Sequence, residues 1–356
     1  MLRDYKGLVL KDKIEQKDNK IQDASGFDRS YVLYDDKILF CNASQGLNNF
    51  KEGKVIMCES CKGTIVEQVK SGKVLVSDGA WGTFLQKKGM QPGECPELWC
   101  VEHRDAVLDI AKSYIEAGAD MVESDSFGGT SFKLEHYGLA DRVVELNEAA
   151  ADISREAAGD HNFVIASIGP TGKMLLMGDI TEEELYNCFK EQAIALENGG
   201  ADAACIETMS AIDEAVLAVR AVKENTMLEA ICTFTFEKTV SGEYRTMMGV
   251  SPAEMVKALL DAGADIVGAN CGNGMERMIE IVREIRAADA DIPILVHANA
   301  GLPKNINGVD VFPDTPEDMA RLVPALVKAG ANIIGGCCGT TPAHIKAIKD
   351  AVLKLK

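Results

Sequence analysis

Histidine, basic residues and long apolar runs are scarce in this chain. Its 356 residues include only 5 His, and 37 Lys and Arg are outnumbered by 55 Asp and Glu, which gives a formal net charge of −18. Nucleic acids and anionic membranes bind basic surfaces, so this charge argues against both as partners. No apolar run reaches the length of about 18 residues that a membrane-spanning helix needs. The hydrophobic content of 47% is nonetheless ample for a large globular core.

The amino-terminal segment lacks the features of a secretion signal. Residues 1–18 are too rich in charged side chains to form the apolar stretch that such a signal requires. We therefore expect a cytoplasmic protein. Its 11 cysteines are then expected to be metal ligands, catalytic groups or core residues rather than disulfides.

Residues 1–72 differ from the rest of the chain in their pattern of predicted secondary structure. Residues 31–40 and 54–58 are predicted as short strands, with a tight turn at Asp35-Asp36, and no long helix is expected here. We interpret this stretch as a small β-rich amino-terminal extension of unknown role. A second domain is predicted over residues 73–356.

The extension also contains half of a metal-binding pattern. Cys58 and Cys61 have the spacing of a zinc knuckle, but the nearest companion is Cys41, and no His lies in the first hundred residues. Ordinary thiols are the default interpretation of this pair, and a structural metal or redox role is the alternative.

From residue 73 onward the chain repeats one unit, a helix that ends in Gly followed at once by a short apolar strand. The Gly accepts the left-handed conformation that ends a helix, and the continuous apolar run is typical of a strand covered on both faces. The clearest copies are residues 117–123, 199–207, 262–270 and 329–335. Further strands are predicted at 74–76, 163–167, 229–233 and 294–297, which makes eight. The helices expected between them include 105–117, 181–198, 253–262, 276–287 and 315–328.

Strict alternation of strand and helix implies parallel strands with right-handed crossovers. Eight such units favour a closed (β/α)8 barrel of the TIM type, with an open, doubly wound sheet as the alternative. Residues 78–83 follow the first strand but do not fit the glycine fingerprint of a dinucleotide-binding sheet. The barrel is therefore the preferred fold.

Reactive groups in such barrels come from the carboxyl ends of the strands. Cys271 follows the sixth strand, and Cys337 and Cys338 follow the eighth, so the three thiols can meet at the barrel mouth. Three thiolates select zinc, and an open fourth position is typical of a catalytic zinc site. The alternative is that these are small buried core residues. Other polar residues at strand ends are Asp78, Ser124, Glu207 and His297.

Several segments together resemble the homocysteine S-methyltransferase family, and most closely the homocysteine-binding module of cobalamin-dependent methionine synthase. The resemblance covers residues from about 73 to 356, and its specific part is the Gly-Gly-Cys-Cys-Gly run with the upstream Asn-Cys pair. The segments that carry it are residues 78–83, 167–172, 206–209, 268–271 and 335–345.

The resemblance implies a zinc-dependent methyltransferase that binds homocysteine as a zinc-bound thiolate and methylates it to methionine. It assigns zinc to Cys271, Cys337 and Cys338, and the substrate's ammonium group to Asp78 and Glu207. It also implies that Ser124 contacts the amino acid. Coordination to zinc deprotonates a thiol, so the nucleophile would form without a general base. Carboxylates are suitable acceptors for an ammonium group, although the same residues often cap helices or form ion pairs.

The methyl donor is left open. The chain has no second barrel for a folate and no room after residue 356 for a cobalamin domain, so we expect either a small molecule or a corrinoid on a separate partner protein. Ser124-Asp-Ser126 stands where the family more often has Thr-Asn-Thr, so another thiol stays open as the acceptor. A non-catalytic zinc-binding or corrinoid-docking subunit is a further alternative. A zinc hydrolase is disfavoured because His is scarce at the strand ends.

Overall fold

The computed structural model describes residues 20–22, 28–34, 37–41, 62–306 and 309–355. Contacts divide the chain into two units, Met1–Cys61 and Lys62–Lys356. In the first unit β1 (Lys20–Gln22), β2 (Asp28–Tyr34) and β3 (Lys37–Cys41) pair antiparallel in the order β1-β2-β3. The strand predicted at 54–58 and the Cys58/Cys61 pair lie outside the described residues. A β-rich domain over residues 1–72 stays a prediction.

The second unit is built on eight parallel strands in a nearly closed barrel, as predicted. From β5 to β12 each strand hydrogen-bonds to the strand of the next unit along the chain, and β15 pairs with β4, so the sheet runs from β4 through β15, β12, β11, β8, β7 and β6 to β5. At the junction of β4 and β5, the backbone N–H of Asp120 donates to Val76 O at 2.7 Å. The strands are β4 (Leu75–Val76), β5 (Met121–Glu123), β6 (Phe163–Ile168), β7 (Ala203–Met209), β8 (Glu229–Phe234), β11 (Ile266–Gly274), β12 (Ile294–Asn299) and β15 (Ile333–Gly336).

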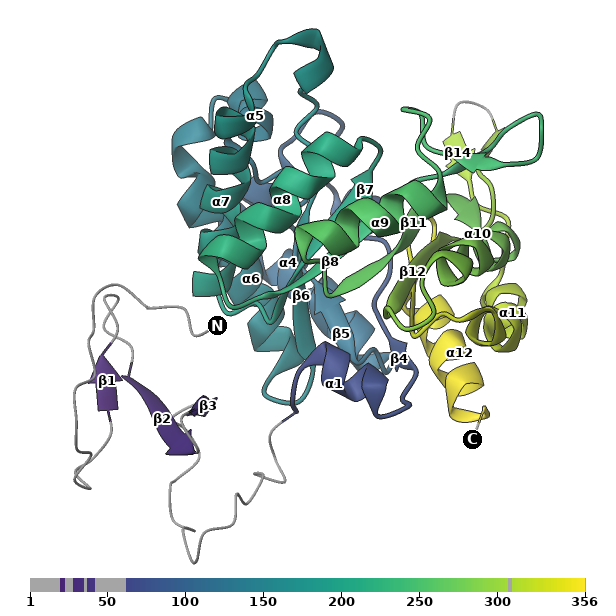
Figure 1. Ribbon diagram of the computed structural model, residues 1–356, viewed down its shortest axis with the longest axis horizontal. Helices are drawn as coiled ribbons and strands as arrows, with labels where there is room; N and C mark the ends of the chain where they lie inside the picture. Colours follow the sequence, from purple (N-terminus) through teal and green to yellow (C-terminus); the bar gives the residue numbers. More distant parts are fainter. Residues whose placement is uncertain (1–19, 23–27, 35–36, 42–61, 307–308, 356) are drawn as a thin grey trace, which may run out of the picture. The chain divides into compact units, whose positions relative to one another are not determined.

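Helices surround these strands (Figure 1). Two antiparallel hairpins follow strand ends, β9 (Glu237–Lys238) with β10 (Tyr244–Arg245) after β8, and β13 (Lys304–Ile306) with β14 (Val309–Val311) after β12. The longer helices are α4 (Arg104–Glu116), α6 (Val143–Ala158), α7 (Glu182–Asn198), α8 (Ile212–Asn225), α9 (Pro252–Ala262), α10 (Met275–Ala288), α11 (Pro316–Ala329) and α12 (Pro342–Leu353). The shorter ones are α1 (Ile65–Lys70), α2 (Gly82–Lys88), α3 (Pro96–Glu102), α5 (Ser131–Leu134), and the 3-10 turns η1 (Glu135–Tyr137), η2 (Ala140–Arg142) and η3 (Leu175–Met177).

Local sequence signals fix the ends of the helices. Thr181 caps α7 and Ser251 caps α9, each in a capping box with the Glu three residues later. Gly263 after α9 and Gly330 after α11 adopt φ of 92° and 121°, where any other residue is strained. Gly263 and Gly330 therefore end α9 and α11 a few residues before the next strand begins.

Helix α1 covers the end of the barrel at which the strands begin. Its buried Ile65 and Val69 pack in one cluster with apolar side chains from all eight strands. The Glu229 carboxylate at the start of β8 accepts from the backbone N–H groups of Ile65 and Val66 at 2.7 and 3.0 Å. The end of the barrel under α1 is thus filled with apolar side chains, so a reactive site is expected at the opposite end, where the strands finish.

Candidate active site and metal centre

The three predicted zinc ligands lie together at the carboxyl ends of the strands. Cys271 belongs to the end of β11, and Cys337 and Cys338 directly follow β15. The Sγ atom of Cys338 lies 3.8 Å from that of Cys271 and 4.0 Å from that of Cys337. All three side chains are partly exposed, whereas Cys95, Cys100, Cys188, Cys205 and Cys232 are buried.

This geometry fits a zinc ion. A tetrahedral site with Zn–S bonds of about 2.3 Å requires sulfur atoms roughly 3.8 Å apart. The two measured separations match that edge, and all three sulfurs lie within 4.8 Å of one another. Hydrogen bonds from the thiols of Cys337 and Cys338 lower the pKa of Cys271, while the hydrogen bonds of Cys337 with Cys271 and Cys338 raise the pKa of Cys337. The donor set is three thiols with one side open, as a catalytic zinc site requires.

Backbone strain marks the positions next to this site. Thr208 and Cys271 are the only non-glycine residues in the described part of the chain with positive φ, at 62° and 56°. Such conformations cost about 1–3 kcal/mol and persist only where the surrounding structure holds them. Both residues lie at strand ends of the mouth, β7 and β11 respectively.

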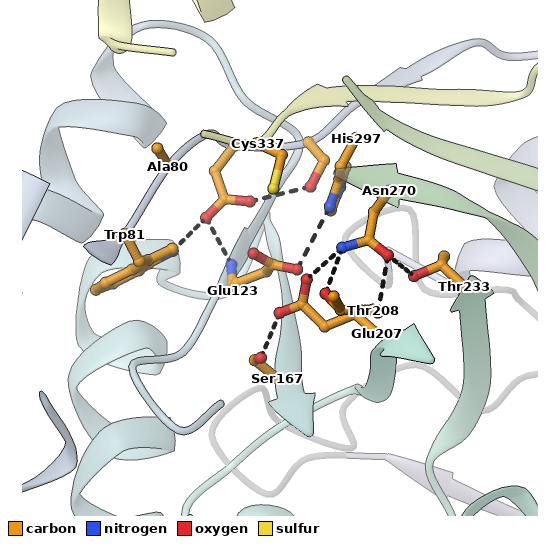
Figure 2. A network of polar contacts seen from close by, with 12 residues as sticks. Ala80, Trp81, Glu123, Ser167, Glu207, Thr208, Thr233, Asn270, His297 and Cys337 are labelled. Carbon is orange, nitrogen blue, oxygen red and sulfur yellow. Dashed lines mark hydrogen bonds and ion pairs between the residues drawn. The ribbon is translucent and has the colours of Figure 1, made fainter. Parts of the chain in front are cut away.

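Glu207 lies on β7, where it is nearly buried and held by two donors. The Ser167 hydroxyl donates to Oε1 at 2.5 Å, and the Asn270 side-chain amide donates to Oε2 at 3.0 Å (Figure 2). Burial is the main cause that raises the pKa of Glu207, to about 7, and the acidic groups of Asp78 and Cys271 add to it. A cation beside this carboxylate would be strongly favoured.

Asp78 follows β4 and is fully buried. Its Oδ2 accepts from the backbone N–H of Glu123 at 2.8 Å and from the Trp81 indole N–H at 2.9 Å (Figure 2). Burial raises the pKa of Asp78 to about 6, against the lowering effect of these hydrogen bonds. The Asp78 carboxylate therefore connects the carboxyl end of β4 to that of β5, whether or not it also contacts a ligand.

Ser124 lies at the end of β5 and is also buried. Its Oγ is 2.6 Å from Ser126 Oγ and accepts from the backbone N–H of Ser167 at 3.3 Å. Cys95 caps α3 and Cys100 lies within it; both are buried beside carboxylates, with Cys95 Sγ 3.2 Å from Glu97 Oε2, and neither belongs to the three-cysteine cluster. Ser124 therefore lies at a strand end of the mouth. Cys95 and Cys100 are not among the candidate metal ligands.

Two further polar residues lie at the mouth, and neither of them was assigned a role from the sequence. Glu123 ends β5, and His297 lies on β12 with Nδ1 3.5 Å from Glu123 Oε1 (Figure 2). Glu123 Oε1 and His297 Nε2 are buried and have no hydrogen-bond partner among the described residues. Burial lowers the pKa of His297 to about 4, so the ring is neutral at pH 7. The position of Glu123 at a strand end was the signal that would have identified it.

The buried carboxylate gives a prediction for stability against pH. The folded-state pKa of Glu207 is raised from 4.5 to about 7, so between these values the folded protein binds more protons than the unfolded chain. The stabilisation from this group is complete below about pH 4.5 and is lost as the pH rises through 7. In metal-free, reduced protein we expect the free energy of unfolding of Glu207→Gln to rise relative to that of the wild type over this range. Urea titrations from pH 4.5 to 8 check this, and a constant difference would contradict it.

The fold and the mouth define a barrel with a three-cysteine cluster beside buried carboxylates. The profile of the family described as homocysteine S-methyltransferase matches residues 75–352. The chain therefore belongs to the homocysteine S-methyltransferase family of enzymes.

Curated relatives agree with this placement, and a solved structure shares the fold. The chain is 31% identical over 307 residues to a methionine synthase of Mycobacterium tuberculosis and 31% identical over 299 residues to that of Mycobacterium leprae. These matches cover 81% and 79% of this chain but only 25% and 24% of the relatives, so the chain spans about a quarter of their length. The metallated form of the homocysteine methyltransferase MmuM of Escherichia coli superposes with a TM-score of 0.66 and 23% identity, covering 80% of this chain and 98% of that one.

The described residues contain no helix that is long and apolar enough to cross a membrane.

Proposed function

We propose that this protein transfers a methyl group to the thiol of homocysteine and so forms methionine. The observation that carries the proposal is the cluster of Cys271, Cys337 and Cys338, whose sulfur spacings fit a zinc ion and whose position is the barrel mouth. Family membership supplies the substrate class.

Zinc is the cofactor that these ligands support. Cys271, Cys337 and Cys338 would hold it, and the open side of the cluster would leave room for one substrate sulfur. When bound, zinc would supply a Lewis acid that makes a coordinated thiol a thiolate at neutral pH. The homocysteine methyltransferase MmuM of E. coli, which shares the fold, has been solved in a metallated form, and this supports a bound metal in the proposal.

The amino-acid part of the substrate would bind next to the metal centre. We assign the ammonium group to Glu207, with Asp78 on the neighbouring side of the mouth, because both carboxylates are buried in surroundings that favour a cation. Ser124 is assigned to the amino-acid portion, where its hydroxyl is already oriented by Ser126. These contacts would fix the thiol over the open side of the cluster.

The reaction then requires little further chemistry from the protein. The sulfur lone pair of homocysteine forms the new S–CH3 bond while the bond between the methyl group and its donor breaks, and the thiol proton leaves to solvent. Holding both partners in line supplies the main advantage over the reaction in solution.

For the donor, we propose a corrinoid carried on a separate protein or domain. The loops that follow β6 and β8, on the mouth side, expose large apolar side chains: Leu176 is 82% exposed, Met177 73% and Met247 79%. Large exposed apolar side chains on the loops beside the mouth would suit a surface that another protein covers. The curated methionine synthase relatives are about four times as long as the region they share with this chain, which also favours a macromolecular donor.

A donor comparison tests this function. We expect zinc-loaded protein to form methionine from homocysteine with methylcobalamin, and not with S-methylmethionine or betaine, when methionine is quantified by mass spectrometry. Cys338→Ala serves as the control that lacks a metal ligand. Transfer from either small molecule but not from methylcobalamin would overturn the corrinoid assignment. No methionine from any donor, with zinc bound, would overturn the catalytic proposal and favour a binding subunit.

A further inference from the structure

We infer that Asn270 is a positioning residue that sets the distance between the metal centre and the ammonium carboxylate, and so selects the chain length of the amino-acid thiol. The inference rests on the proposed function, because it takes the metal to be held by Cys271 and the ammonium group by Glu207. Asn270 lies directly before Cys271 and contacts Glu207, which makes it the link between the two.

The side chain of Asn270 is fully buried, and both of its polar atoms are fully used. Its Nδ2 group donates to Glu207 Oε2 at 3.0 Å and to Thr208 Oγ1 at 2.7 Å. Its Oδ1 accepts from the Thr208 backbone N–H and from the Thr233 hydroxyl, each at 2.8 Å. Two donated and two accepted bonds leave the amide one orientation, so it acts as a rigid spacer.

The four bonds connect three consecutive strands of the barrel. Asn270 lies on β11, Thr233 on the adjacent β8, and Glu207 and Thr208 on β7, which is the next strand beyond β8. The residues from alternate strands of a barrel fill the same layer, and the Asn270 side chain connects β11 to β7 within such a layer (Figure 2). No backbone hydrogen bond between β7 and β11 is available for this purpose, because β8 separates them.

Both strands are irregular where this connection is made. The register of β7 against β8 shifts between Ile206 and Met209, and that of β11 against β12 shifts between Asn270 and Gly274. Thr208 and Cys271, the two residues with positive φ, lie inside these irregular segments. The ladder hydrogen bonds therefore do not fix Glu207 and Cys271 relative to each other, and the Asn270 amide does.

Selection of chain length follows from a fixed spacing. Cysteine is one methylene shorter than homocysteine, so it cannot reach the metal centre and the carboxylate together if their separation is held. If Glu207 could move relative to the metal centre, the site could bind both cysteine and homocysteine. Asn270→Asp keeps the size of the side chain and its two accepted bonds but removes the donor to Glu207 and places a negative charge opposite it.

The test compares the affinity of three thiols for zinc-loaded protein by calorimetry: homocysteine, cysteine, and 4-mercaptobutyrate, which is homocysteine without the amino group. For Asn270→Asp we expect homocysteine affinity to fall about tenfold, as for one lost hydrogen bond to a charged group, and its advantage over cysteine to shrink. Affinity for 4-mercaptobutyrate should change less than about twofold. Asn225→Asp is the control, because Asn225 ends α8 at the side of the barrel where the strands begin, and its side-chain amide donates to the Tyr186 hydroxyl and to Ala221 O. It should leave all three affinities as in the wild type.

A second variant keeps the test decisive if Asn270→Asp folds poorly. Thr208→Gly suits the backbone conformation at φ 62° and removes the Thr208 side chain, including the hydroxyl that accepts from the Asn270 amide, so the preference for homocysteine over cysteine should again shrink. Equal losses for homocysteine and 4-mercaptobutyrate, or an unchanged preference in both variants, would overturn the positioning role while leaving the proposed function intact. A wild-type protein that bound zinc but no homocysteine would overturn the proposed function itself and the selectivity inference with it.

Discussion

Cys338→Ala is expected to lose its zinc and, with it, all methyl transfer. Removing one of three protein ligands leaves two thiolates, and we expect zinc affinity to fall by at least about a hundredfold, since even indirect partners of a metal ligand contribute 10- to 100-fold. The fold should survive, because Cys338 follows a strand end and is partly exposed. Zinc content by mass spectrometry and the circular dichroism spectrum measure the two effects.

Cys188→Ala is the control for that variant. Cys188 is a buried cysteine of α7 outside the mouth, and its replacement should leave about one zinc per chain. Cys271→Ala and Cys337→Ala should behave like Cys338→Ala. Full zinc occupancy in Cys338→Ala would contradict the assignment of the three ligands.

Glu207→Gln is expected to weaken homocysteine binding by about 1.5–3 kcal/mol, the range for a hydrogen bond to a charged group. The amide keeps the shape of the side chain and its neighbours Ser167 and Asn270, but it removes the negative charge that would face an ammonium group. Zinc content should hardly change. Binding is measured by calorimetry on zinc-loaded protein.

A buried glutamate elsewhere separates a loss of charge from a general loss of stability. Glu214 on α8 accepts hydrogen bonds from Thr171 and is likewise nearly buried, so Glu214→Gln is the matched variant and should bind homocysteine normally. An unchanged dissociation constant for homocysteine in Glu207→Gln would show that this carboxylate is structural.

The fold was predictable because its signals are local and repeated. The Gly that ends each helix and the apolar run that follows recur in successive units, and all eight predicted strands are present. Helix α1 was missed, since six residues carry no clear period. Its contribution depends on contacts with all eight strands, such as that of Ile65 in the shared apolar cluster, which no local pattern reveals.

The candidate site was predictable only where position along the chain implies position in space. Cys271, Cys337 and Cys338 are strand-end residues, and the barrel topology brings them together. The roles of Asn270 and Glu123 depend on side-chain geometry: whether an amide points across β8 to Glu207, or whether Glu123 lies near His297, is decided by rotamers and burial. The sequence places Glu123 at a strand end, but it does not reveal either of these contacts.

X-ray absorption at the zinc edge tests the central claim most directly, because it counts the sulfur atoms around the metal. We predict three sulfur ligands in zinc-loaded protein and four after homocysteine is added, with Zn–S distances of about 2.3 Å. A count that stays at three with saturating homocysteine, or that is below three without it, would contradict the account.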